Sequence, residues 1–554
     1  MRPFAAVDPA RDKPSVVDTH EFERSRHFRE RCGWVHRAMN VDPAKVNPAL
    51  ARSEPILSSG KMAGPTSPSR RTRWAVFSLV ALLGLALRLP HLSARPMHTD
   101  EAVNAYIVGQ LLAGGSFAYD SEDRHGPALA AMALPLVRMQ GARIFSDLTE
   151  SELRLTTVLA GTVTILLFGL SAETFGFVPC VIAALLFAAP SLPVYYDRYF
   201  IHESLFTAAT LGLILTASRR GTLTQAALAG CCAALMLASK ETAVVHFVAL
   251  AAAALCFWLW NLRAKSLSCF WRWQAIVIGA AFFLVLTVVL YTWFGSNWKG
   301  FAALLHAIPN FARRAAGEGH QKPFWYYGKL LAGGWSGGIV LALALIGFFR
   351  SVKGREPSPY GIVAFYVVFL AAIYSAIPYK TPWLALNLWL PIALLAGLAL
   401  ESLWRMPARS PVPRKFISTV YIFLGLMLAA TIAHDTVQRV FAHPSEESNP
   451  YAYAHTSEDL LGLPAMIEEL ARQNAIAAPR IAVIAADPWP LPWYLRHFSQ
   501  TGFWQPGQQP GKADFYITSS DAADEYRDQL KDFHADFFGV RPGVLILLWS
   551  PLPK

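Results

Sequence analysis

The chain has 554 residues, of which 54% are hydrophobic and only 16% are charged. Soluble domains carry about 25% charged residues, so this composition excludes an ordinary soluble protein. The formal net charge is +11. Its basic residues are scattered between apolar stretches and accompany no nucleic-acid-binding module. We therefore attribute the charge to membrane orientation and to contact with anionic lipid headgroups, and expect no nucleic-acid partner.

The apolar stretches have the length of membrane-spanning helices, which need about 20 apolar residues. We predict eleven spans, near residues 74–90, 152–170, 177–193, 201–217, 224–238, 242–260, 274–294, 333–349, 360–377, 383–403 and 416–433. The segment 128–145 carries Arg138, Arg143 and Pro135, so we expect it to form an interfacial helix.

Lys and Arg clusters in the connections predict the orientation. If the basic flank at 69–73 lies inside, the other clusters, at 218–222, 263–273, 350–356 and 405–415, also fall inside, as the positive-inside rule requires. The expected protein is a multi-pass protein of the cell (inner) membrane. Its C-terminus then lies on the extracytoplasmic side.

The composition divides the chain into three parts. We expect 1–73 to be a disordered or mis-annotated extension with a basic flank, because Met62 stands just before the first span. Residues 74–433 form the transmembrane domain and 434–554 a domain outside the cytoplasm. The six cysteines contain no C-x-x-C pair, and none lies in a connection predicted to be outside. Neither a disulfide framework nor a thiolate metal site is expected.

Polar and aromatic side chains gather in the connections predicted to face outside. They are His98, Asp100, Glu101, Asp123, His125, Tyr196, Asp197, Arg198, His202, Glu203, Lys240, Glu241, Lys380 and Trp383. Taken singly, each is also explained by solvation at a helix end or, for Lys380 and Trp383, by anchoring at the headgroups. Ionisable groups at a membrane edge are costly unless they pair or line a wet cavity. Their common side and depth therefore favour one outward-facing cavity.

Carboxylates and cations together suggest group transfer from a phosphate-bearing donor. Arg198, Lys240 and Lys380 are the candidate phosphate ligands. Asp100 is the candidate general base and Glu101 its orienting partner. Walls formed by membrane helices would suit a donor with a long lipid tail.

Two alternatives use the same residues. His98-x-Asp100, Asp123-x-His125 and His202–Glu203 could ligate a divalent metal ion, the only candidate cofactor, although these spacings match no specific metal signature. A transporter also places acids and bases in the membrane, but usually near its midplane rather than at one edge.

Several motifs in this order resemble a known group of proteins. They are "HTDEAVNAYIVGQLLAGGSFAYD" (98–120), "RHGPAL" (124–129), "YYDRYFIHE" (195–203), "SKETA" (239–243), "KTPWL" (380–384) and "DPWPLPWYLR" (487–496). Over about 74–500 the chain resembles the GT-C superfamily of polyprenyl-phosphate-sugar-dependent glycosyltransferases, which includes protein mannosyltransferases and lipid A aminoarabinose transferases. More narrowly, it resembles a subfamily labelled flippase-activity-associated membrane proteins.

This resemblance implies a GT-C membrane fold with an external active site in the cell envelope. Asp100 would be the catalytic base, and residues 195–203 would help to bind the donor phosphate. The implied partners are a polyprenyl-phosphate sugar donor, membrane lipids and an acceptor that is a glycan, a lipid or a protein. The alternative is a non-catalytic flippase-associated protein or a transporter for lipid-linked sugars.

The C-terminal part reads as a small α/β domain. We predict a helix over 457–474 and strands over 480–486, 513–519 and 543–550, in a largely parallel sheet. Trp489, Trp493 and Tyr494 follow the first strand and either stack on a sugar or pack this domain onto the membrane part. The strand carries no G-x-G-x-x-G motif, so nucleotide binding is not supported.

Overall fold

The computed structural model describes residues 68–552 except 122–123, 220–221, 264–272, 308, 311–312, 314–320, 354–357 and 406–412. The expected N-terminal extension therefore lies outside the described residues, apart from its basic flank, and so does Asp123. Residues Ser67–Lys554 form one compact unit, to which both the helical bundle and the C-terminal sheet belong.

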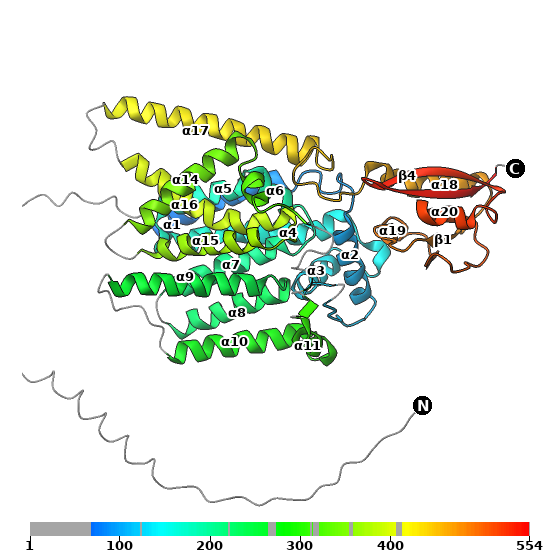
Figure 1. Ribbon diagram of the computed structural model, residues 1–554, viewed down its shortest axis with the longest axis horizontal. Helices are drawn as coiled ribbons and strands as arrows, with labels where there is room; N and C mark the ends of the chain where they lie inside the picture. The colour runs from blue at the N-terminus through cyan, green and yellow to red at the C-terminus, as the bar shows by residue number, and fades with distance from the viewer. Residues whose placement is uncertain are drawn as a thin grey trace, which may run out of the picture. The chain divides into compact units, whose positions relative to one another are not determined.

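The helical part occupies most of this unit (Figure 1). Its helices are α1 (Arg70–Arg88), α2 (Thr99–Leu112), α3 (Ala128–Met139), α4 (Glu150–Phe175), α5 (Phe177–Ala188), α6 (Ser191–Asp197), α7 (Glu203–Ser218), α8 (Leu223–Ser239), α9 (Ala243–Arg263), α10 (Trp273–Tyr291), α11 (Trp298–Leu305), α13 (Tyr326–Leu331), α14 (Gly334–Val352), α15 (Pro359–Ala376), α16 (Ala385–Arg405) and α17 (Arg414–Thr436). The long helices run side by side, and α2 and α3 lie together at one end of them.

Among the described residues, seven helices are long and apolar enough to cross a membrane, or eight if the bent pair α5 and α6 forms one span. They include α4, α9, α10, α14 and α15, together with the segments Pro382–Arg405 and Lys415–Ala442. The chain is thus a multi-pass membrane protein. All eleven predicted spans contain a helix, but eleven crossings are not shown. The helices α7 and α8 have only 16 and 17 residues, and α1 carries several arginines.

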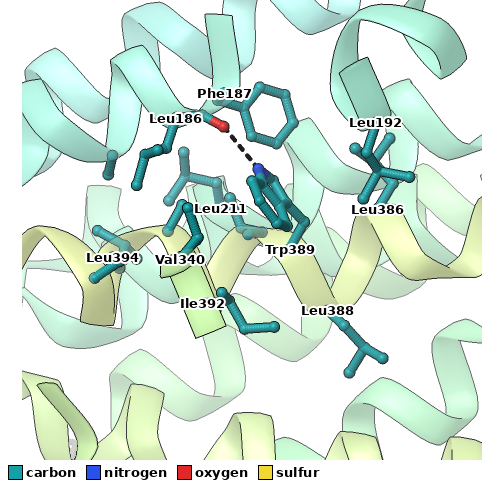
Figure 2. Packing of buried hydrophobic residues seen from close by; sticks show 14 of the residues in the cluster. Leu186, Phe187, Leu192, Leu211, Val340, Leu386, Leu388, Trp389, Ile392 and Leu394 are labelled. Atoms are coloured by element: carbon teal, nitrogen blue, oxygen red, sulfur yellow. Dashed lines mark hydrogen bonds between the residues drawn. The ribbon is translucent and has the colours of Figure 1, made fainter. Parts of the chain in front are cut away.

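The centre of the bundle is built around α16, whose span is 89% buried. Trp389 of this helix donates its indole N–H to the carbonyl oxygen of Leu186 in α5, at 2.7 Å (Figure 2). This bond satisfies the polar atom of a large side chain that is otherwise surrounded by apolar groups. In the Lys415–Ala442 span, in contrast, no residue of the most apolar stretch is buried within the protein. The helix α17 therefore presents this surface to lipid.

The segment 128–145 folds as expected for a segment that does not span. The helix α3 ends at Met139 after 12 residues, and the short 3-10 helix η2 (Phe145–Asp147) follows. Twelve residues rise only about 18 Å, which is less than the hydrocarbon thickness.

The C-terminal part contains a five-stranded sheet, in the order β2-β1-β3-β5-β4. Its strands are β1 (Arg480–Ile484), β2 (Gln500–Trp504), β3 (Phe515–Ser519), β4 (Phe533–Arg541) and β5 (Val544–Pro551). The strand β1 is parallel to β2 and β3, whereas β5 is antiparallel to β3 and β4. The sheet is therefore mixed, and the prediction of a largely parallel sheet was wrong.

The strands β2 and β4 were not predicted from the sequence, and both are edge strands of this sheet. Each is largely half-buried or exposed, so neither has the continuous apolar run by which a central strand is recognised. The predicted helix over 457–474 is present as the 3-10 helix η6 (Glu458–Gly462) followed by α18 (Leu463–Gln473).

Candidate functional site

A cavity of about 530 Å³ is bordered by α2, the start of α7 and the residues that follow α8. It is lined by Thr99, Asp100, Val103, Asn104, Ile107, Arg124, His125, Ile201, His202, Glu203, Lys240, Glu241, Thr242, Val245, Tyr327, Tyr374, Ile377, Tyr379, Thr381, Trp383, Leu384 and Trp489. A second hollow of about 490 Å³ on α14 is lined only by Gly334, Trp335, Gly338, Ile339 and Ala342. The second has no ionisable lining, so the first is the candidate site.

The start of α2 places Asp100 in this cavity. His98 caps the helix, because its Nδ1 accepts a hydrogen bond from the Asp100 backbone N–H at 3.0 Å. Its Nε2 must then carry the proton that is donated to the carbonyl oxygen of Tyr453, at 3.1 Å. Burial lowers the pKa of His98, although Asp100 and Glu101 partly oppose this shift. His98 is thus a neutral structural cap and does not line the cavity.

Glu101 points away from the cavity into the protein core. Its two carboxylate oxygens accept hydrogen bonds from Arg154 Nε and Nη2, both at 2.7 Å, and one also accepts the Phe200 N–H at 2.8 Å. Burial by itself would raise the pKa of Glu101, but Arg154 outweighs this effect and lowers it. The carboxylate therefore remains ionised. Any orienting effect on Asp100 acts through the backbone of α2.

The predicted phosphate-binding stretch 195–203 is divided between core and cavity. Asp197 is fully buried, and its Oδ2 accepts hydrogen bonds from Arg88 of α1 at 2.9 Å. The Arg198 guanidinium donates to the carbonyl oxygens of Arg88, Pro90 and His91, at the end of α1. Neither side chain lines the cavity.

Tyr196 and Lys380 also have structural contacts. The Tyr196 hydroxyl donates to the carbonyl oxygen of Tyr451 at 3.1 Å. The Lys380 ammonium, which is buried, donates to the carbonyl oxygens of Lys322 and Ile377. Both residues lie outside the cavity lining.

One ion pair and one hydrogen-bonded His–Glu pair form part of the cavity wall. The Lys240 ammonium lies 2.5 Å from Glu203 Oε1 and 5.7 Å from the centre of the Trp383 ring. Burial opposes the charge of Lys240, but Glu203, with smaller effects of Tyr379 and Asp100, raises its pKa. Lys240 is therefore a permanent cation whose field reaches Asp100.

A hydrogen bond joins His125 to Glu241, with Nδ1 and Oε2 2.8 Å apart. The Tyr119 hydroxyl donates to the other oxygen of Glu241, also at 2.8 Å. Burial would raise the pKa of Glu241, but His125 and Tyr119 lower it to about 2. The His125 ring also meets the His202 ring edge-on, with centroids 5.2 Å apart.

The structure thus brings half of the predicted site residues to one cavity. Those that line it are Asp100, His125, His202, Glu203, Lys240, Glu241 and Trp383. Those that do not are His98, Glu101, Tyr196, Asp197, Arg198 and Lys380. Asp123 lies outside the described residues.

Several lining residues were not predicted from the sequence, among them Arg124, Asn104 and Tyr374. Arg124 stands within the "RHGPAL" motif, so its position was a usable signal. Tyr374 lies in the apolar helix α15, where its sequence context distinguishes it in no way from a core tyrosine.

The described residues contain no group of three or more His, Cys, Asp or Glu side chains placed to hold a metal ion. Two of the candidate ligands are engaged elsewhere, because His98 is turned to Tyr453 and Glu203 to Lys240.

The fold is similar to solved structures of membrane glycosyltransferases. ArnT from Cupriavidus metallidurans bound to undecaprenyl phosphate superposes with a TM-score of 0.60 and 13% identity, over 86% of this chain and 98% of that one. AglB, the oligosaccharyltransferase from Archaeoglobus fulgidus, in complex with an inhibitory peptide and a dolichol-phosphate, gives 0.50 and 13%, over 84% and 73%. No protein-family model and no curated protein matches the sequence.

These similarities show a GT-C-like fold. At 13% identity they show the fold alone.

Proposed function

We propose that this chain is an integral membrane glycosyltransferase, which moves a sugar from a polyprenyl-phosphate donor to an acceptor in the cavity. The observation that carries the proposal is that Asp100 shares this cavity with Lys240, so that a base and a cation face one space. The similarity to structures that contain undecaprenyl phosphate and dolichol-phosphate supports a donor of this chemical class.

In the proposed reaction the Asp100 carboxylate accepts the proton of an acceptor hydroxyl. The hydroxyl oxygen forms a bond to the anomeric carbon of the donor sugar. The bond between this carbon and the phosphate oxygen breaks, and the phosphate leaves with the electron pair. Lys240 and Arg124 stabilise the negative charge that develops on the leaving oxygen.

This assignment differs from the expected set of phosphate ligands. Arg198 and Lys380 already donate to backbone carbonyl oxygens outside the cavity, whereas Lys240 and Arg124 line it. Lys240 is held by Glu203, and a phosphate that enters can share its remaining N–H donors.

We place the cavity on the extracytoplasmic side, on the basis of the Lys and Arg clusters in the opposite connections. On this side the acceptor is a component of the cell envelope. A sugar donor attached to a lipid can reach the cavity from within the membrane.

A second candidate function follows from the resemblance to flippase-activity-associated proteins. Lys240 is paired with Glu203, and Glu241 accepts hydrogen bonds from His125 and Tyr119, so these side chains of the cavity wall are satisfied without a substrate. That arrangement would also suit a chain that helps lipid-linked sugars to cross the membrane and transfers nothing.

The two functions can be separated with the purified full-length protein in liposomes that contain radiolabelled polyprenyl-phosphate sugars and an envelope extract as acceptor. We expect sugar transfer by the wild type and a loss of at least about 100-fold in Asp100→Asn, since general-base catalysis contributes about 10²–10⁴. Asp524→Asn, at an exposed position of the C-terminal part, is the control and should transfer normally. Transfer by Asp100→Asn at the wild-type rate would refute the proposal. Donor crossing without transfer by the wild type would support the second function.

A further inference from the structure

The aromatic stretch after β1 divides into two kinds of residue. The Trp493 indole N–H donates to Glu150 Oε1 at 2.8 Å, and the Tyr494 hydroxyl accepts the Met97 backbone N–H at 2.8 Å. Both side chains are buried and attach the C-terminal part to the bundle. Trp489 is half-buried and lines the cavity. Packing therefore accounts for Trp493 and Tyr494 but leaves Trp489 with a surface that faces the candidate site.

Trp489 is also held in place. Its backbone N–H donates to Asp487 Oδ1 at 3.2 Å, and Asp487 Oδ2 accepts from Arg541 of β4 at 3.2 Å. The Trp489 ring meets the Tyr106 ring of α2 at 69°, with centroids 5.8 Å apart. A side chain fixed before binding loses little conformational entropy when a ligand packs on it.

Polar groups for a ligand lie on the neighbouring wall. Asp100, Val103, Asn104 and Ile107 follow a spacing of three and four residues and line the cavity from one face of α2. Trp489 lines the same cavity, so an aromatic ring shares this space with a face of α2 that carries a carboxylate and a carboxamide.

We propose that Trp489 is the stacking platform for a sugar ring of the acceptor, which is therefore a glycan or a glycosylated molecule. The inference rests on the proposed function and names the acceptor class of the same site. A sugar ring presents apolar C–H groups on its faces and hydroxyl groups at its edges. The indole of Trp489 suits the faces. Asp100 and the side-chain oxygen of Asn104, whose amide nitrogen donates to the Phe200 carbonyl oxygen, suit the hydroxyl groups.

The position of Trp489 favours the acceptor over the donor. Trp489 precedes α19 (Leu491–Tyr494), which packs on α2 and lies between α2 and the sheet (Figure 1). The donor's lipid tail has to remain among the spanning helices, which extend away from α2 on its other side. An isoprenoid tail is also a poor ligand for a wall that carries Asp100 and Asn104.

Saturation-transfer NMR with the full-length protein in detergent micelles tests this proposal. The probes are soluble oligosaccharides without phosphate, namely mannobiose, arabinobiose, maltotriose and chitotriose. We expect at least one to bind with saturation of its ring C–H protons, and Trp489→Ala to weaken that binding by about tenfold. Trp489→Phe should retain part of it. Trp335→Ala is the control, because Trp335 is 83% exposed and does not line the cavity.

Every outcome decides the proposal. No binding of any probe by the wild type, or equal binding by Trp489→Ala, would overturn it. Competition by a sugar-bearing polyprenyl phosphate, but not by polyprenyl phosphate alone, would assign Trp489 to the donor sugar and overturn the acceptor assignment. Binding that depends on Trp489 without any sugar transfer would keep Trp489 as a sugar-binding residue, but it would refute the proposed enzymatic function and with it the acceptor assignment.

Discussion

Glu101 and Arg154 form a buried ion pair with two hydrogen bonds of 2.7 Å, and neither side chain lines the cavity. Asp100, the neighbour of Glu101 in the sequence, does line it. Adjacent residues of a helix point about 100° apart, so one turn of α2 serves both the core and the site. The two acids of this turn should therefore respond differently to substitution.

We expect Glu101→Ala to lower the stability of the protein by about 3–5 kcal/mol, because it leaves Arg154 buried and charged without its partner. The thermal unfolding midpoint in detergent, followed by tryptophan fluorescence, measures the effect. Arg154→Ala should be similarly destabilising, and the double variant should lose less than the sum of the two. Asp100→Asn is the control and should unfold near the wild-type temperature. A larger loss in Asp100→Asn than in Glu101→Ala would contradict this division of roles.

Arg198 should behave as a structural residue. Its removal in Arg198→Ala leaves the carbonyl oxygens of Arg88, Pro90 and His91 without their donor, which should cost about 2–3 kcal/mol. Arg198→Lys should recover only part of this loss, because an ammonium lacks the planar fork of a guanidinium.

The folded fraction of Arg198→Ala should still bind polyprenyl phosphate with unchanged affinity, as measured with a fluorescent lipid analogue. Arg527→Ala, at an exposed position, serves as the control for a lost positive charge. An Arg198→Ala protein that is as stable as the wild type but binds the lipid at least about tenfold more weakly would restore Arg198 as a phosphate ligand.

Glu241 should make stability depend on pH in the acid range. Its pKa is about 2 in the folded protein, against an ordinary value of 4.5, mainly because His125 offsets the effect of burial. Since the folded-state pKa is depressed, the carboxylate stabilises the fold above pH 4.5, and this contribution disappears as the pH falls from about 4.5 to about 2. This contribution to stability is of the order of 3 kcal/mol at most. Because the His125 side chain is one-third exposed, solvent screens its interaction with Glu241 and reduces the contribution further.

The measurement compares the unfolding midpoints of the wild type and Glu241→Gln between pH 6 and pH 2. Their difference should be largest at the upper end and should shrink toward pH 2. Glu468→Gln, at an exposed position of α18, should differ little from the wild type at every pH. If the wild type instead became more stable relative to Glu241→Gln as the pH falls, the pKa of Glu241 would not be lowered in the folded protein.

Gly126 should set how closely His125 approaches α8. A Cβ atom at this position would lie 2.2 Å from the carbonyl oxygen of Ala238, two residues before Lys240. Gly126→Ala must therefore move the loop away from α8, and should cost about 1–3 kcal/mol. Gly425→Ala is the matched control, because a Cβ there meets nothing within 4 Å, and alanine favours a helix.

A double variant shows whether the loop acts through the hydrogen bond between His125 and Glu241. If Gly126→Ala separates these two side chains, the double variant Gly126→Ala/Glu241→Gln should lose less stability than the sum of the losses in the two single variants. Full additivity would place the effect of Gly126 elsewhere.

Much of the membrane architecture could be read from the sequence. Apolar runs of the length of a bilayer each contain a helix, because a chain in lipid has to satisfy its backbone hydrogen bonds within such segments. The number of spans could not be read in the same way. The helices α7 and α8 are apolar but have only 16 and 17 residues. The helices α5 and α6 are bent by 61° relative to one another, so they form a broken span or two separate segments. The edge strands β2 and β4 were missed because half-exposed strands lack a strong apolar pattern.

The amino-acid sequence indicates which residues are costly near a membrane, and so which segments carry the candidate site. Charge and hydropathy are local properties, and Asp100, His125, Lys240 and Glu241 could be singled out from them. The folded chain, in contrast, buries Glu101, Asp197 and Arg198 in the core and brings Trp489 to the cavity. The role of a charged group depends on the partner beside it, and folding brings that partner from a distant segment, as it brings Arg154 to Glu101.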